Sequence, residues 1–147
     1  MVNGVAFHPT KNVLASCSND STIKLWNTDT GAELSTLSCD LPVLSIDWHD
    51  QRVAAGCLDG TIKVFDAQSG DCLSTVNVGS MVFSVHFSPS GDTVAAGCYD
   101  GTVQIIDVAT AEVKRPLHVG YAFSRCSTRI SLPARPLFSR FSTRISV

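Results

Sequence analysis

The sequence predicts an all-β protein assembled from repeated units of four short antiparallel strands. Two observations support this prediction: one ten-residue stretch occurs three times, and strand and turn signals alternate around every copy. The copies are residues 18–27, 57–66 and 98–107, and the aspartates in their turns lie 39 and 41 residues apart. A period close to forty residues indicates one supersecondary unit that packs against the next copy of itself.

The second unit shows the expected strands most clearly. Apolar and β-branched runs separated by turn residues predict its strands. The four expected strands are 43–48, 53–57, 61–65 and 72–76. Asp59-Gly60 predicts a tight hairpin turn between the second and third strands, because glycine adopts positive φ without a steric cost. Residues 49–52 are expected to form the turn that precedes the second strand.

The other two units follow the same order of strands and turns. Their first strands are expected at 2–7 and 81–87, and residues 88–91 have the composition of a β-turn. Four short antiparallel strands in forty residues are typical of one blade of a β-propeller. The sequence therefore predicts a domain of three blades over residues 1–118. The expected blades are about 2–37, 41–76 and 80–117.

These units resemble WD40 repeats. Each has a first strand that ends in an aromatic residue, a stretch similar to D-G-T-I-K-x-W-D, and a short outer strand. The resemblance covers residues 2–117 and implies WD40-type β-propeller blades. Because propellers close with four to eight blades, three blades are expected to form an open or incomplete ring. Three explanations stay open: a truncated product of a larger propeller, assembly with itself or another chain, and a stable open array.

The resemblance also implies a buried Asp–His–Ser–Trp network, which this sequence can form only in part. Residues 38–39 and 77–78 replace the Gly-His pair of the family, and only the first unit keeps both Ser18 and Trp26. The turn aspartates are therefore expected to cap their own hairpins through side-chain-to-backbone hydrogen bonds. These structural turn residues are Asp20, Asp59 and Asp100.

The charges divide the chain into two parts. Residues 1–113 hold four bases and all 13 acids, a net charge of −9, whereas residues 114–147 hold seven bases and no acid, a net charge of +7. Such a shift marks a boundary. The segment 119–147 is thus expected to be a basic Ser/Arg-rich tail outside the propeller.

This tail repeats itself, since residues 123–131 recur at 138–146 with eight of nine positions identical. We expect it to be disordered or non-native, such as the product of a shifted reading frame. Two alternatives stay open: a basic amphipathic helix that lies on a membrane or partner, and a tail that binds the acidic body. Pro133 and Pro136 and the weak helix formers around them count against the helix.

Motifs that carry chemistry are absent from the sequence. It has no nucleophile elbow, no H-E-x-x-H, no phosphate loop and no C-x-x-C pair, so we expect no enzyme, no metal and no cofactor. Free thiols and the lack of a basic-then-apolar leader or a membrane-length apolar run predict an intracellular protein, cytoplasmic or nuclear. Neither a nucleic acid nor a membrane is favoured as a partner.

The predicted function is a non-catalytic scaffold that binds peptides or other protein subunits. The resemblance implies that partners dock where the loops between blades meet the central hairpin turns. The residues of this sequence at the corresponding positions are Asn3, Asn19, Leu44, Leu58, Phe83 and Tyr99. Phe83 and Tyr99 are expected to form the main anchor, since large aromatics dominate binding energy.

Alternatives to this site and to this function stay open. Phe83 could instead pack between blades while Tyr99 is only exposed. The chain could supply blades to a larger or oligomeric ring through self-association, or be a truncated product without a function of its own.

Overall fold

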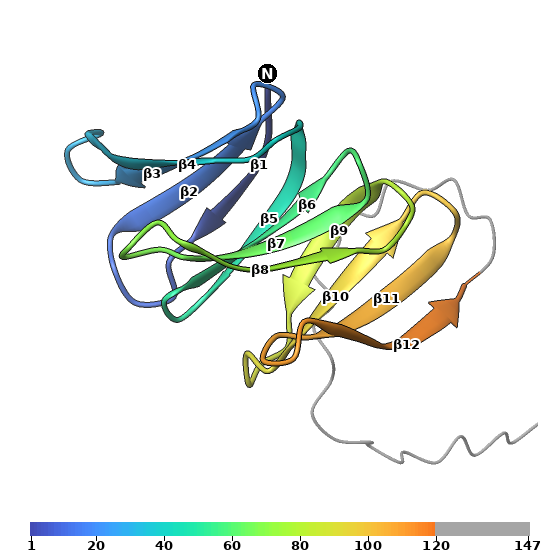
Figure 1. Ribbon diagram of the computed structural model, residues 1–147. Coiled ribbons are helices and arrows are strands. Elements are labelled where there is room, and N and C mark those ends of the chain that lie inside the picture. The colour runs from blue at the N-terminus through green and yellow to red at the C-terminus, as the bar shows by residue number, and fades with distance from the viewer. Residues whose placement is uncertain (120–147) are drawn as a thin grey trace, which may run out of the picture.

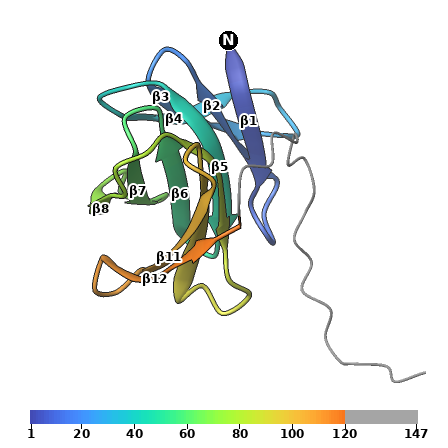
Figure 2. The same ribbon diagram turned by 90° about the vertical axis from the view of Figure 1, so that its right-hand side faces the viewer.

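The computed structural model describes residues 1–119, so the expectations for the tail fall outside the described part except for Val119. The described residues form three four-stranded antiparallel sheets, each built from four strands in chain order, and they contain no helix. Figures 1 and 2 show the sheets following one another as separate blades. This confirms the predicted all-β fold with four-stranded propeller blades.

The strand bounds are as follows. Blade 1 consists of β1 (Val2–Phe7), β2 (Val13–Ser18), β3 (Thr22–Asn27) and β4 (Glu33–Ser38). Blade 2 consists of β5 (Val43–His49), β6 (Arg52–Cys57), β7 (Thr61–Asp66) and β8 (Cys72–Asn77). Blade 3 consists of β9 (Val82–Phe87), β10 (Thr93–Cys98), β11 (Thr102–Asp107) and β12 (Glu112–His118).

The first turn of blade 2 is shorter than the sequence suggested. His49 pairs with Arg52 in the β5–β6 ladder, so only Asp50 and Gln51 connect the two strands. Asp50 takes a φ of 51°, in the left-handed region. The expectation of a turn over 49–52 was wrong at both ends, because a two-residue hairpin loop needs positive φ and aspartate tolerates it.

The turn aspartates make the expected hydrogen bonds in all three blades. Asp59 Oδ1 accepts hydrogen bonds from the Thr61 amide at 2.9 Å and from the Thr61 hydroxyl at 2.6 Å. Asp20 and Asp100 accept the same pair of bonds from the threonine two residues on. Each carboxylate thus holds the hairpin turn at the start of the third strand of its blade.

The tryptophan of blade 1 has a different partner from the one expected. Trp26 Nε1 donates a hydrogen bond to Ser16 Oγ at 2.9 Å, whereas Ser18 Oγ accepts one from the Asp20 amide at 3.2 Å. Ser18 stands at the end of β2, beside the turn, while Ser16 lies two residues earlier in the strand, away from the turn and opposite Lys24. The assignment of Ser18 to the tryptophan network was therefore wrong.

The blades pack through their first two strands. The first strand of blade 2, β5, contacts β1 and β2, and the first strand of blade 3, β9, contacts β5 and β6. A Cβ at Gly56 would lie 2.5 Å from Val82 Cγ1, so the missing side chain is what lets blade 3 approach β6. Apolar residues alone are fully buried among the described residues, and they form one cluster around each of the two blade junctions.

Candidate functional site

One edge of the array gathers the turns between the second and third strands of each blade and the loops between blades. We call it the aspartate edge, because Asp20, Asp59 and Asp100 lie in its turns; it is the upper edge in Figure 1. Two loops meet there: the Asp100 amide donates a hydrogen bond to Ser80 Oγ at 3.1 Å, and a Cβ at Gly60 would lie 2.9 Å from the Ser80 amide nitrogen. The turn of blade 2 and the turn of blade 3 are thus joined through Ser80.

Three of the predicted contact residues occupy a β-bulge at the start of the first strand of their blade. The pairing register skips Asn3 in β1, Leu44 in β5 and Phe83 in β9, while the residues on either side are paired. A bulge leaves the extra residue out of the ladder and can re-aim its side chain. The same local irregularity therefore presents all three side chains beside the aspartate edge.

The other three predicted residues sit next to these bulges. The amides of Asn19, Leu58 and Tyr99 each donate a hydrogen bond, at 2.9–3.0 Å, to the carbonyl of the residue just before the first strand of the same blade. For blade 3 that acceptor is Met81, two residues before Phe83. The six residues thus form three neighbouring pairs, one in each blade.

The pair in blade 3 is aromatic and exposed. The ring centroids of Phe83 and Tyr99 are 6.0 Å apart, with the rings tilted by 52°, and 54% of each residue is exposed. This geometry is that of an aromatic pair, and both rings remain accessible beside one another. Phe83 is therefore not buried between blades.

The pairs in blades 1 and 2 have a different character. Asn3 Nδ2 donates hydrogen bonds to Asn19 Oδ1 at 2.7 Å and to the Val43 carbonyl at 2.8 Å, so it ties blade 1 to blade 2. Leu58 is exposed and Leu44 is half-buried. Leu41, in the loop before β5, is also exposed and was missed by the sequence analysis, although an apolar residue in a polar connection is a usable signal.

The aspartate edge is negatively charged. Hydrogen bonds from the Thr22 and Thr102 hydroxyls and amides lower the pKa of Asp20 and of Asp100. Both carboxylates are therefore ionised at neutral pH, and in the described part neither they nor Asp59 form an ion pair with Lys or Arg. Asp40, in the loop after β4, is neutralised by Lys63 at 2.6 Å. The exposed apolar side chains thus lie near carboxylates that have no Lys or Arg partner in the described part.

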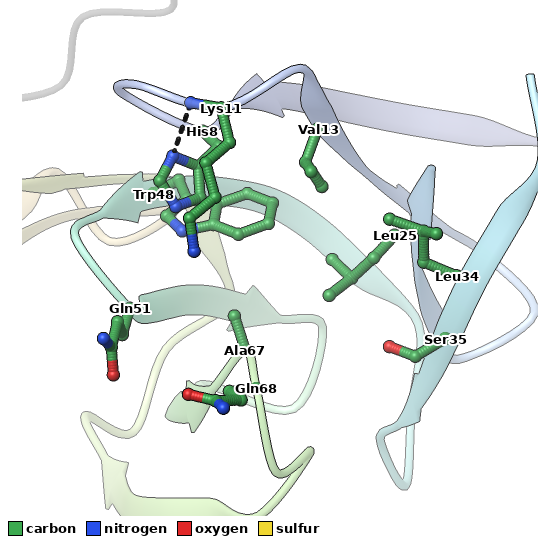
Figure 3. Close-up of a pocket in the computed structure, with 10 residues that line it drawn as sticks. All are labelled: His8, Lys11, Val13, Leu25, Leu34, Ser35, Trp48, Gln51, Ala67 and Gln68. Atoms are coloured by element: carbon green, nitrogen blue, oxygen red, sulfur yellow. Dashed lines mark hydrogen bonds between the residues drawn. The ribbon is translucent and has the colours of Figure 1, made fainter. Parts of the chain in front are cut away.

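A hollow lies at the opposite edge, between blades 1 and 2 (Figure 3). Its volume is about 370 Å³, and its wall combines apolar side chains with His8, Lys11, Gln51 and Gln68. His8 packs on Trp48 with ring centroids 5.0 Å apart, and burial is the main cause that lowers its pKa. His8 Nδ1 already accepts hydrogen bonds from the Thr10 and Lys11 amides, so this nitrogen is not placed to act on a ligand.

The described residues contain no group of three His, Cys, Asp or Glu side chains that could hold a metal ion. Within that same part, no helix has the length and hydropathy that a membrane span needs. The fold and this edge define a class of protein, a β-propeller repeat protein whose exposed loops lie on a rigid array.

The family described as "WD domain, G-beta repeat" matches residues 1–27, 31–66 and 70–107. The chain therefore belongs to the WD40 repeat family. Each of the last two matches starts before the outer strand of one blade and ends with the third strand of the next, so the sequence repeat and the blade are offset by one strand.

Three curated relatives illustrate the similarity. The chain is 35% identical over 79 residues to "COMPASS component SWD3" of Saccharomyces cerevisiae, over 51% of this chain and 25% of that protein. It is 33% identical over 110 residues to "WD40 repeat-containing protein HOS15" of Arabidopsis thaliana, over 63% of this chain and 17% of that protein. It is 30% identical over 91 residues to "Eukaryotic translation initiation factor 3 subunit I" of Saccharomyces cerevisiae, over 60% and 26%. The chain spans about a quarter or less of these relatives' lengths.

Among solved structures, the WD40 domain of coronin from Toxoplasma gondii matches with a TM-score of 0.75. The match covers 80% of this chain and 33% of that one, at 22% sequence identity. This likeness supports the fold.

Proposed function

We propose that this protein is a non-catalytic interaction scaffold that binds peptides or protein subunits at the aspartate edge, through Phe83 and Tyr99. The observation that carries the proposal is the exposed aromatic pair, positioned by a β-bulge and by the turn of blade 3. Exposed aromatics on a rigid support are favoured anchors, because they supply contact area at little entropic cost.

The relatives support a partner of protein type. Two of them are named as a component of COMPASS and as a subunit of translation initiation factor 3, which are names of assemblies. The free thiols of the five cysteines in the described part fit a reducing, intracellular compartment. We therefore propose proteins as partners, in the cytoplasm or nucleus, without a cofactor.

The proposal is tested with peptides selected from a random library against the full chain. We expect Tyr99→Ala to weaken their binding at least tenfold, because truncating a hot-spot aromatic removes most of its contact area. Leu73→Ala is the matched control, since Leu73 is equally exposed but lies on the outer strand β8. Unchanged affinity in a folded Tyr99→Ala variant would falsify the aromatic anchor.

A second candidate function is to supply blades to a larger or oligomeric ring. The observation that favours it is the exposure of Phe7, which is 69% exposed at the end of β1. At the same place in blade 2, Trp48 is covered by blade 1 and is 8% exposed. We therefore propose that the uncovered face of β1 packs against another blade.

A further inference from the structure

The chain leaves the described structure beside the aromatic pair. His118, the last residue of β12, pairs with Thr102, and the Val119 amide donates a hydrogen bond to the Gly101 carbonyl at 3.2 Å. Gly101 follows Tyr99 and Asp100 in the turn of blade 3. Val119, the last described residue, therefore lies at the aspartate edge, next to the surface assigned to partners.

The charge of the remaining segment is opposite to the charge of this edge. Residues 1–119 hold six bases against 13 acids, a net charge of −7, while residues 120–147 hold five arginines and no acid, a net charge of +5. Asp59 and Asp100 flank Ser80 and have no Lys or Arg partner among the described residues. The negative charge of this edge therefore favours the binding of a peptide that carries arginines.

The first repeat of that segment combines an aromatic residue with two arginines. Phe123 stands four residues beyond Val119, and Arg125 and Arg129 follow it. Four extended residues span at most about 14 Å, which is enough to reach around the adjoining turn. A short tether also holds the segment at an effective concentration in the millimolar range, so weak contacts suffice for binding.

We infer that residues 123–131 bind in cis to the aspartate edge, with Phe123 against Phe83 and Tyr99 and the arginines against Asp59 and Asp100. This inference rests on the proposed function, because it assigns an occupant to the same surface. The segment then acts as an internal competitor, and a partner must displace it to bind. The second copy, residues 138–146, has the same motif on a longer tether and binds less often.

The test is a photo-cross-link within the full chain. Phe123→p-benzoylphenylalanine is irradiated, and the cross-linked peptides are identified by mass spectrometry. We expect cross-links at monomer mass to the segments that contain Phe83 and Tyr99. The yield falls at least threefold with Asp59→Asn/Asp100→Asn, a change that removes both charges while keeping the oxygen that accepts the threonine hydrogen bonds.

A matched pair of charge reversals supplies the control. Arg125→Glu/Arg129→Glu is expected to reduce the cross-link at least threefold, and Arg140→Glu/Arg144→Glu, the same change in the second copy, leaves it unchanged. Cross-links only to other surfaces, no cross-links, or cross-links only at dimer mass would overturn the inference, and the last result would make a second copy the occupant.

The peptides selected for the proposed function separate the two ideas. We expect them to bind the full-length Arg125→Glu/Arg129→Glu variant several-fold more tightly than the unchanged chain, because the competitor is weakened. If they bind both chains equally but still require Tyr99, the competitor is disproved and the scaffold stands. If they do not depend on Tyr99 while the cross-link forms, the scaffold fails and the internal contact stands.

Discussion

At the scale of single residues, the serine hydroxyl and the tryptophan indole that bond to each other in blade 1 are both absent from blades 2 and 3. Ser16 and Trp26 are hydrogen-bonded in blade 1, and the pairing registers place Ala55 and Phe65 at these positions of blade 2. In blade 3 the same positions hold Ala96 and Ile106. An indole N–H left without an acceptor in a partly buried site would cost free energy, so the loss of one partner permits the loss of the other.

We predict that Ser16→Ala lowers the free energy of unfolding by about 1 kcal/mol, because it leaves the Trp26 N–H unpaired. In a Trp26→Phe background the same change has almost no effect, since no donor remains. Chemical denaturation of the four variants measures this coupling. Ser18→Ala is the control: its effect is the same in both backgrounds. Equal costs of Ser16→Ala with and without the indole would contradict the assignment.

At the scale of strands, blade 2 and blade 3 are joined by a polar contact between β5 and β9. Asp47 Oδ2 accepts a hydrogen bond from the Phe87 amide at 2.7 Å and lies 3.7 Å from His86 Nδ1. The Asp47 carboxylate raises the pKa of His86. Burial alone would raise the pKa of Asp47, but the His86 ring and the backbone amides outweigh burial and lower it. Both pKa shifts favour the charged forms of the two side chains, protonated His86 and ionised Asp47.

The direction of these shifts predicts a pH dependence. A histidine whose folded-state pKa is raised stabilises the fold fully below its unfolded pKa of about 6.5, and this contribution is lost as pH rises through the folded pKa. The charged pair stabilises the unchanged chain at pH 5.5 but not at pH 8.5. His86→Gln lacks this contribution, so we expect the substitution to lower the free energy of unfolding by about 0.5 kcal/mol more at pH 5.5 than at pH 8.5. The figure is small because 47% of the His86 side chain is exposed and solvent screens the pair.

The comparison is made by chemical denaturation at both pH values. His8, His49 and His118 are present in both chains, so the difference between the chains isolates His86. The same pH dependence in His86→Gln and in the unchanged chain would show that the contact contributes nothing.

The strands themselves could be predicted, and the contacts between them could not. Each hairpin is encoded locally, by a turn such as Asp59-Gly60 between two apolar runs, and this suffices to place the strands within about two residues. The bulges at Asn3, Leu44 and Phe83 depend on how two strands pair. The Asp47–Phe87 bond joins residues forty positions apart, and only the packing of blades brings them together.

For the candidate site the same division holds. The resemblance predicted that the six residues lie together along one edge, because the spacing of turns fixes which loops meet, and the structure pairs them there, one pair in each blade. It did not distinguish Asn3, which is used to link two blades, from Phe83, which is exposed beside Tyr99. That difference depends on side-chain partners in the neighbouring blade and turn.

At the scale of the whole molecule, one face of each blade is covered by the preceding blade in blades 2 and 3 but is exposed in blade 1. Trp48 of blade 2 packs on His8 of blade 1, and Phe87 of blade 3 packs on His49 of blade 2, with ring centroids 5.7 Å apart in the second pair. Phe7 holds the corresponding position in blade 1 and is exposed together with Val2 and Val5. A row of exposed apolar side chains on one face of a sheet favours association with another sheet.

We predict that the full chain self-associates through this face as its concentration rises. Each exposed apolar side chain that becomes fully buried contributes about 1.5–3 kcal/mol, so β1 supplies a sizeable part of a weak interface. Light scattering coupled to size exclusion should give a mass above 15.7 kDa that increases with concentration. Val5→Ser/Phe7→Ser should return the mass to that of the monomer, because the apolar row is broken. Leu73→Ser, on the exposed outer strand of blade 2, is the control and should not change the mass. If the chain without substitutions stays monomeric throughout the concentration series, the prediction of a ring completed by blade-to-blade packing is wrong.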